Sequence, residues 1–331
     1  MQGCGVFELI DDDLSVCGTD FEMVVRMQLQ TNLDLELQTV LYAETDLQTR
    51  TILHDYFSHI FTDHAHDISI GFYDTTKDEL VYSINEVIDA NQSTYTFFLP
   101  KDEYHAIALA NLKNNSIATL MDTLSSRQVR LTTPVQDTLL TQQTGLFATQ
   151  REISVIDTAD QRIDLTLHMV TSALALVIDT TGVTVHGITA CMGPTVNSMM
   201  LRDSLFLYDH PKIIRMETID PNISASAPMA KRAQVEEESY HMALLGSASF
   251  PSAETPDAND VYYEAKVYVS MTDGTITETV LSVHEPLRAG QLKVLRLQLQ
   301  PDGEVVPIEA PEVGASVTLD WKNGGEHNIE I

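Results

Sequence analysis

The sequence predicts a mainly all-β protein made of two antiparallel β-sandwich domains, with a short helix inserted in the first. Three observations support this fold class. Apolar and polar residues alternate along several stretches, which is the period of a half-buried strand. Short strand-like stretches recur between polar or proline-containing turns. The chain has 331 residues, 44% of them hydrophobic, which suffices for a core but is too long for one typical β-domain.

The first predicted strand spans residues 20–30. Met23, Val25 and Met27 share one face of it, and Arg26 lies on the other. Further strands are expected over 68–73, 80–84, 94–99, 104–112, 153–156, 163–169 and 170–178. Their spacing is typical of sandwiches.

Turn chemistry delimits the later strands. Hairpin turns are predicted where a residue pair supplies the positive φ that tight turns need: Asp273-Gly274, Asp302-Gly303 and Asn323-Gly324. A last strand is expected over 317–321. The stretches 220–238 and 246–260, with their Pro, Ser and Ala, are expected to be long loops.

One helix is predicted over residues 46–61, because apolar residues recur there at three- and four-residue spacings without Gly or Pro. We expect this helix to pack on the first domain through Leu53, Phe57 and Ile60.

The stretch 125–150 is rich in Thr and Gln and has weaker periodicity than its flanks, so it predicts a domain junction. The expected division is a leader over 1–19, an N-terminal β-sandwich domain over 20–135 and a C-terminal β-sandwich domain over 145–331.

Charge argues against nucleic-acid binding. The chain carries 19 Lys and Arg against 48 Asp and Glu, a formal net charge of −29, so phosphate backbones would be repelled.

No apolar run approaches the roughly 20 residues that span a bilayer. No phosphate-binding loop or Gly-x-Gly-x-x-Gly motif occurs. We expect no nucleic-acid partner, no cofactor and no small-molecule substrate.

Cysteine is scarce, and the odd set of Cys4, Cys17 and Cys191 excludes a disulfide-dense framework. Cys17 and Cys191 could pair in an oxidising compartment. Alternatively, Cys191 could be a reduced core residue among small apolar neighbours, which is the interpretation we favour.

Histidines gather at and beyond the predicted helix, at His54, His59, His64 and His66. His59 and Asp63 have the i,i+4 spacing that places two ligands on one helical face. The other histidines point elsewhere or lie past the helix end, and no Cys or Glu completes a motif. We therefore expect no metal site.

Catalytic motifs are also missing from the sequence. There is no Gly-x-Ser-x-Gly elbow, and Cys191 and His186 fall on opposite faces of a predicted strand. The many carboxylates leave a glycosidase pair as an alternative, although a single Trp offers few platforms for stacking sugars. We expect no enzyme.

The N-terminal residues resemble a known family. Met1-Gln2-Gly3-Cys4 is similar to the end of a bacterial lipobox, in which a small residue precedes a Cys that becomes acylated. The next motif-like stretch is Ile10-Asp11-Asp12-Asp13-Leu14-Ser15-Val16-Cys17, followed by the alternating strand. The combination resembles the Bacteroidales lipid-anchored fimbrial anchor (minor) subunit family.

This resemblance implies two transthyretin-like domains and a structural anchor and assembly role at the base of a fimbria. Cys4 would carry the lipid that holds the surface-exposed protein to the outer membrane, and fimbrial subunits would join it by β-strand addition. Shaft and tip subunits of related fimbriae are matured by cleavage after a basic residue in an N-terminal propeptide. No Lys or Arg lies between Cys4 and Arg26, and Arg26 lies within the first predicted strand, which favours the anchor interpretation.

The alternative function is a surface lipoprotein that binds or processes glycans. It would share the same leader. Clustered exposed aromatic side chains around a concave pair of carboxylates would favour it.

Overall fold

The computed structural model describes residues 20–29, 37, 40–41, 46–61, 65–87, 94–113, 115, 117–156, 161–220 and 240–308. Several expectations fall outside the described residues: Cys4 and Cys17 in the leader, His64, the strand over 317–321 and the turn at Asn323-Gly324. In the described part of the chain, no helix is both long enough and apolar enough to cross a membrane.

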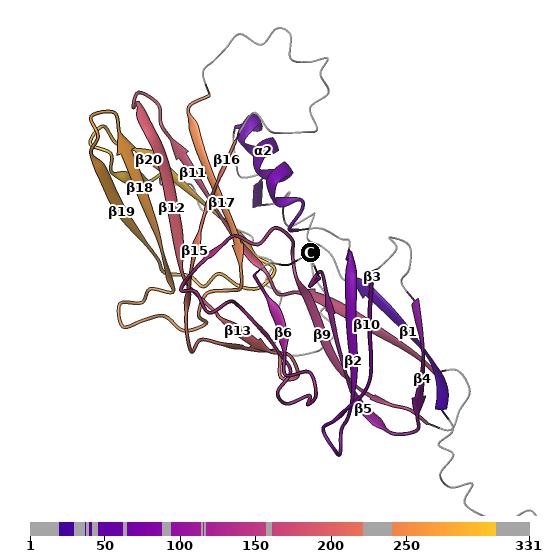
Figure 1. Cartoon of the computed structure of the whole chain (residues 1–331). Helices are drawn as coiled ribbons and strands as arrows, with labels where there is room; N and C mark the ends of the chain where they lie inside the picture. Colours follow the sequence, from indigo (N-terminus) through magenta and orange to yellow (C-terminus); the bar gives the residue numbers. More distant parts are fainter. Residues whose placement is uncertain are drawn as a thin grey trace, which may run out of the picture.

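Strands dominate the described residues (Figure 1). The strands of the first half are β1 (Asp20–Leu29), β2 (Asp67–Asp74), β3 (Leu80–Val87), β4 (Thr94–Pro100), β5 (Glu103–Ala110), β6 (Thr119–Met121), β7 (Arg130–Thr132), β8 (Thr138–Leu140), β9 (Phe147–Ser154) and β10 (Gln161–Met169). Those of the second half are β11 (Ser172–Asp179), β12 (Val185–Thr195), β13 (Ser198–Met200), β14 (Leu205–Leu207), β15 (Lys212–Arg215), β16 (Glu217–Ile219), β17 (Met242–Ser249), β18 (Tyr263–Met271), β19 (Ile276–Val283), β20 (Leu292–Leu299) and β21 (Val305–Pro307).

These strands form four sheets, which we name for reference. The folded sheet has seven strands in the order β3-β2-β5-β9-β10-β1-β4. The inner sheet has the order β16-β17-β11-β20-β21, and the outer sheet has the order β19-β18-β12-β15-β8. The small sheet has the order β14-β13-β7-β6.

The folded sheet is itself a sandwich. Strands β9 and β10 pair only through Ala148 with His168 and Phe147 with Met169. The half β3-β2-β5-β9 can therefore fold over the half β10-β1-β4. The rings of Phe72 in β2 and Phe97 in β4 meet across the interior with centroids 4.9 Å apart, and both side chains are fully buried.

The inner and outer sheets face each other and form the second sandwich. Their shared core includes Leu174 and Leu176 of β11, Ile188 of β12 and Val267 of β18. The fold class predicted from the sequence is thus confirmed: the protein is mainly β, with two sandwiches and a short helix near the start. The predicted hairpin turns are confirmed at Gly274 and Gly303, whose φ angles are +90° and +87°.

The pairing is less uniformly antiparallel than the sequence suggested. Three pairs of neighbours run parallel: β1 with β10, β11 with β20, and β15 with β8. Parallel pairing needs a long connection between the two strands, and each of these pairs is separated by many residues of chain. Alternation within a strand does not reveal which distant strand will lie beside it.

Strand β11 is buried on both faces. Ala173, Ala175 and Val177 belong to the core of the folded sheet, whereas Leu174 and Leu176 belong to the core between the inner and outer sheets. A strand covered on both sides reads as a continuous apolar run, as this one does. The two sandwiches therefore share β11 at their boundary, and β17 likewise contributes Leu244 to the first core and Leu245 to the second.

The predicted helix is α2 (Leu47–Phe57), which ends before the expected residue 61. Asp46 caps its N-terminus by accepting a 2.8 Å hydrogen bond from the Thr49 amide. Leu53, Phe57 and Ile60 are buried in the first core, as expected.

The helix also contacts the second sandwich, which the sequence did not indicate. The Tyr56 hydroxyl donates a 3.2 Å hydrogen bond to Oε2 of Glu217 in β16, and the hydroxyls of Thr49 and Tyr240 lie 2.8 Å apart. Figure 1 shows α2 beside β16 and β17. The helix thus bridges both sandwiches rather than packing on the first alone.

The domain boundary between residues 135 and 145 stays a prediction, and the sheet topology leads us to propose a later one. Strands β9 and β10, over residues 147–169, pair within the folded sheet, whereas β8 pairs with β15 in the outer sheet. The weak periodicity of the stretch 125–150 has a structural reason, because β7 and β8 within it are only three residues long. We propose that the chain passes finally from the first domain to the second after Met169; the leader over 1–19 stays a prediction.

One predicted loop is partly a strand. Residues 246–249 of the expected loop 246–260 form the end of β17. Their small side chains are needed because the strand is tightly covered: a Cβ on Gly246 would lie 2.5 Å from Cε1 of Tyr56.

This close approach predicts the effect of Gly246→Ala. We expect a loss of about 1–3 kcal/mol in the free energy of unfolding, because the added methyl group displaces the Tyr56 ring and loosens α2. Denaturant unfolding followed by circular dichroism measures it. Gly187→Ala is the control, since a Cβ there meets nothing within 4 Å. Equal stability of the two variants would contradict the bridging role of α2.

Candidate assembly site

Strand β1 is the central strand of its half of the first sandwich. It pairs antiparallel with β4, from Asp20 opposite Pro100 to Arg26 opposite Thr94, and parallel with β10 on its other side. Removing β1 would therefore separate β4 from the rest of the folded sheet.

The buried face of β1 contributes to the first core. Met23 and Val25 have no exposed surface, and Met27 is 7% exposed. Burying one such side chain contributes roughly 1.5–3 kcal/mol. The first strand is therefore a stabilising part of the domain.

Arg26 lies on the opposite, exposed face of β1. It is the first Lys or Arg in the chain. A cut after Arg26 would remove the whole stretch of β1 that pairs with β4. The structure thus supports the interpretation that a cut there would destroy a strand rather than release a leader.

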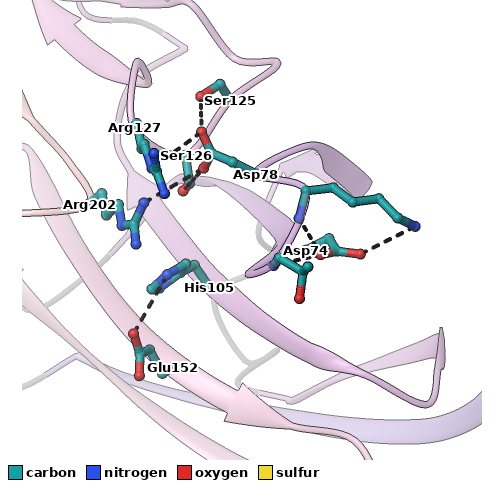
Figure 2. A network of polar contacts seen from close by, with 10 residues as sticks. Asp74, Asp78, His105, Ser125, Ser126, Arg127, Glu152 and Arg202 are labelled. Atoms are coloured by element: carbon teal, nitrogen blue, oxygen red, sulfur yellow. Dashed lines mark hydrogen bonds and ion pairs between the residues drawn. The ribbon is translucent and has the colours of Figure 1, made fainter.

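A polar network joins the first sandwich to the small sheet (Figure 2). The Asp78 carboxylate, in the turn between β2 and β3, accepts hydrogen bonds from the hydroxyls of Ser125 and Ser126. Its oxygens also lie 3.9 Å from Nε of Arg127 and 3.7 Å from Nη1 of Arg202. One carboxylate therefore ties together three turns that are distant in the sequence.

The environment of Asp78 favours its charged form. Partial burial raises the pKa of this carboxyl, but the hydrogen bonds from Ser125 and Ser126 and the positive charge of Arg127 outweigh it, so the pKa lies below its usual value. Asp78 also has a φ of +59°, a conformation that Asp and Asn tolerate better than most residues.

His105 lies beside this network on β5. It is 4% exposed, its Nε2 lies 3.6 Å from Oε1 of Glu152, and its Nδ1 has no hydrogen-bond partner among the described residues. Burial and the nearby charge of Arg202 lower the pKa of His105, so the ring is neutral at pH 7. The charged part of the network is therefore Asp78 with Arg127 and Arg202. We call Asp78 with the side chains that contact its carboxylate, Ser125, Ser126, Arg127 and Arg202, the Asp78 clamp.

The expected site residues are not brought together. Cys4 lies outside the described residues, so its lipidation stays a prediction. Cys191 is a free thiol, half-buried on β12 between Arg215 and Lys266 of the neighbouring strands, and so is not the core residue that we favoured. Burial raises the pKa of its thiol. Its alternative partner, Cys17, lies outside the described residues.

The absence of a metal site also stays a prediction. His59 and His66 are exposed, and His54 lies 3.9 Å from Asp55. Among the described residues, no group of three or more His, Cys, Asp or Glu side chains could hold a metal ion. His64 lies outside them.

Sequence reasoning missed the Asp78 clamp. Its members are far apart in the chain, and each has an ordinary local explanation as a turn residue. Nothing short of the tertiary arrangement indicates that two serines and two arginines converge on one carboxylate.

The fold and its sequence relationships define a structural protein of fimbriae. The chain belongs to the family of fimbrillin-A associated anchor proteins Mfa1 and Mfa2, whose family model matches residues 31–199, just over half of the chain. Members of this family are structural proteins of the cell surface that associate with fimbrillin subunits, not enzymes. No curated protein matches the chain.

Solved structures share this fold. A candidate adhesin from Bacteroides ovatus has a TM-score of 0.54 at 11% identity, covering 94% of this chain and 99% of its own. The fimbrial anchor protein Mfa2 from Porphyromonas gingivalis has a TM-score of 0.50 at 12% identity, covering 87% and 95%. A candidate polysaccharide-binding protein from Bacteroides thetaiotaomicron has a TM-score of 0.52 at 10% identity, covering 88% and 99%. At these identities, the likeness establishes the fold alone.

The Asp78 clamp predicts a pH-dependent stability term. We expect Asp78→Asn to lower the free energy of unfolding at pH 7 by about 1–3 kcal/mol, because hydrogen bonds to a charged group are lost. A folded pKa below the unfolded value means that the carboxylate stabilises the fold above about pH 4 and loses this effect as the pH falls through its folded pKa.

Denaturant titrations of wild type and variant at pH 7 and pH 3 measure this effect. The difference between them should shrink at pH 3. Asp209→Asn, at an exposed position, is the control and should change little. A wild-type-to-variant difference that stays constant across this range would contradict the clamp.

The central position of β1 predicts resistance to cleavage. An arginine-specific endoprotease should leave the bond after Arg26 intact in the folded protein, because both edges of the strand are paired and cutting requires local unfolding. Intact-mass spectrometry measures the outcome, and the urea-unfolded protein, which should be cut there, is the control. Loss of residues 1–26 from a domain that stays folded would show that β1 is dispensable.

Proposed function

We propose that this protein is the anchor and assembly subunit of a fimbria. It holds the base of the fibre to the outer membrane through a lipid on Cys4, and it joins fimbrial subunits by β-strand addition. The observation that carries this proposal is the central, paired position of β1 in a chain of the anchor family.

The position of β1 links the lipid to the fold. A lipid on Cys4 can hold the sandwich only if the chain between them stays uncut. No Lys or Arg lies between Cys4 and Arg26, and Arg26 is held within a strand that is paired on both sides. Cleavage after a basic residue would therefore have no target in the leader.

The acyl chains expected on Cys4 would bind the membrane stably. A single acyl chain binds a bilayer only reversibly, whereas two or more give stable attachment. A lipobox Cys receives a diacylglyceryl thioether and an N-acyl group, as the resemblance of Met1-Gln2-Gly3-Cys4 implies. Such a group on Cys4 would hold a fibre base.

Strand addition is the mode of assembly that a sandwich fold permits. The added strand gains affinity from main-chain hydrogen bonds and specificity from pockets for alternate side chains. Edge strands of the folded sheet and of the small sheet offer unpaired backbone groups for it.

The glycan alternative draws no support from the described aromatic residues. Tyr82 and Phe98 are the large exposed aromatics among them. The Tyr82 ring lies 5.8 Å from Phe97 on the inner side, whereas Phe98 follows Phe97 in β4 and points to the opposite face. The two do not form a common platform for a sugar.

The test of the anchor is Cys4→Ala in the native host, expressed with its full signal peptide. We expect the variant to leave the membrane fraction and the fibres to be shed into the medium, because the lipid attachment is lost. Fractionation and immunoblotting measure both.

Cys191→Ala is the matched control and should stay with the membrane, since Cys191 lies on the folded domain. If the Cys4→Ala protein remains in the membrane fraction and fibres stay attached, Cys4 is not the anchor.

A further inference from the structure

Strand β1 begins at the end of the first sandwich that lies farther from the second sandwich. Asp20 is opposite Pro100, the last residue of β4. Leu29 is opposite Leu167 of β10, and β10 continues after Met169 into β11 of the inner sheet. Figure 1 shows the same arrangement, with β1 and β4 at the lower right and β11 and β20 at the upper left. The chain that precedes Asp20 therefore joins β1 at its far end.

Strands β1 and β10 run parallel and are held at opposite ends. Tension between the N-terminal segment and the second sandwich would act on the start of β1 and on the end of β10. Such tension draws β1 lengthwise past β10. Because the hydrogen bonds of a β-ladder run across the strands, a lengthwise pull loads all seven residue pairs of this ladder together. A pull that lifts one end of a strand would instead open its pairs one after another.

The buried face of β1 also opposes lengthwise movement. Side chains alternate between the two faces of a strand, so a slip by one residue exchanges the faces. Arg26 would enter the site of Val25, which has no exposed surface, and Met23 would leave the core. Burying a charge without a partner is costly. The core therefore adds to the resistance of the ladder.

The connection between β10 and β11 is short and fully buried. It consists of Val170 and Thr171, which have no exposed surface. The Val170 amide donates a 2.8 Å hydrogen bond to the Leu146 carbonyl, and the Thr171 carbonyl accepts one of 2.8 Å from the Gly290 amide. The Thr171 hydroxyl donates a further 2.8 Å bond to Oε1 of Gln142. Tension would therefore pass from β10 into β11 without a loop that could extend.

Strand β11 distributes this tension in the second sandwich. It lies between β17 and β20 in the inner sheet and pairs with them over eight and seven residues. The pairing with β20 is parallel, as is that of β1 with β10. A continuous series of paired strands thus connects Asp20 to the middle of the second sandwich.

We propose that β1, β10 and β11 form a tension path, which transmits force between the N-terminal membrane attachment and the second sandwich. This inference rests on the proposed function, because tension arises only if Cys4 is held in a membrane and a fibre is joined to the folded body. Along this path the ladder of β1 and β10 is sheared and not peeled. Forced unfolding is governed by an unfolding rate, and that rate would be lowest for a pull in this direction.

Single-molecule force spectroscopy in two directions tests the tension path. One handle is joined to the N-terminus of the full chain. The other is joined to p-azidophenylalanine that replaces either Thr181, in the turn after β11, or Lys101, directly after β4, and both positions are exposed. The first pair of handles shears β1 past β10. The second opens β1 from β4, beginning at Asp20 and Pro100.

We expect the force that detaches β1 to be greater by about twofold or more with the handle at position 181, because seven residue pairs then share the load. Denaturant unfolding of both labelled proteins checks that they are equally stable. Equal forces in the two directions, or a greater force with the handle at position 101, would overturn the tension path.

A pair of valine variants separates the tension path from general stability. Val25 of β1 and Val267 of β18 are both fully buried, but only Val25 lies on the path. Both Val25→Ala and Val267→Ala should lower the free energy of unfolding in denaturant. We expect only Val25→Ala to lower the force that detaches β1 with the handle at position 181. Equal reductions by the two variants would show that this force reports general stability, which would contradict the inference.

The outcomes distinguish this inference from the proposed function. Equal forces in the two directions, together with shedding of the Cys4→Ala variant, would remove the tension path and leave the anchor role intact. Retention of the Cys4→Ala variant in the membrane fraction would overturn the anchor role, and with it the membrane attachment on which the tension path depends, whatever the two forces are.

Discussion

The double burial of β11 is the constraint on which the rest of the structure depends. Its alternate residues face two different cores, with Ala173, Ala175 and Val177 on one side and larger Leu and Ile side chains on the other. The small residues let the first sandwich and α2 approach closely, and the large ones fill the space between the inner and outer sheets. A polar residue on either face would be buried without a partner. The two sandwiches are therefore joined through strands of the inner sheet that contribute to both cores, with β11 at the centre of that sheet.

The other contacts between the sandwiches follow from this shared strand. Because β11 brings the two bodies together, α2 can bridge to β16 and β17, where Gly246 leaves room for the Tyr56 ring. The small sheet, built from β6 and β7 of the first half and β13 and β14 of the second, covers the outside of the first sandwich. The Asp78 carboxylate accepts hydrogen bonds from the Ser125 and Ser126 hydroxyls and so holds the β6–β7 loop of the small sheet to the β2–β3 turn.

Strands β1 and β6 occupy different positions in their sheets, because β1 has a neighbour on both sides and β6 lies at an edge. The position of β1 is filled by the chain's own residues, and Met23 and Val25 are fully buried. Strand β6, in contrast, is at the edge of the small sheet and pairs only with β7 among the described strands. The proposed anchor role depends on the filled position of β1, because a lipid on Cys4 could hold the fold only through an uncut N-terminal chain.

Local periodicity determined much of this protein by itself. The alternation over residues 20–30, the helical spacing after Asp46 and the Asp-Gly turns identify strands, helix and hairpins, because each depends on neighbours within a few residues. The family resemblance came from the leader, which carries the motif-like residues. The tertiary structure alone decided the partners: β9 and β10 return to the folded sheet, α2 spans both sandwiches, and Asp78 meets residues about 50 and 120 positions away. Alternation says which face of a strand is buried, but it carries no information about which distant strand or charge will lie against it.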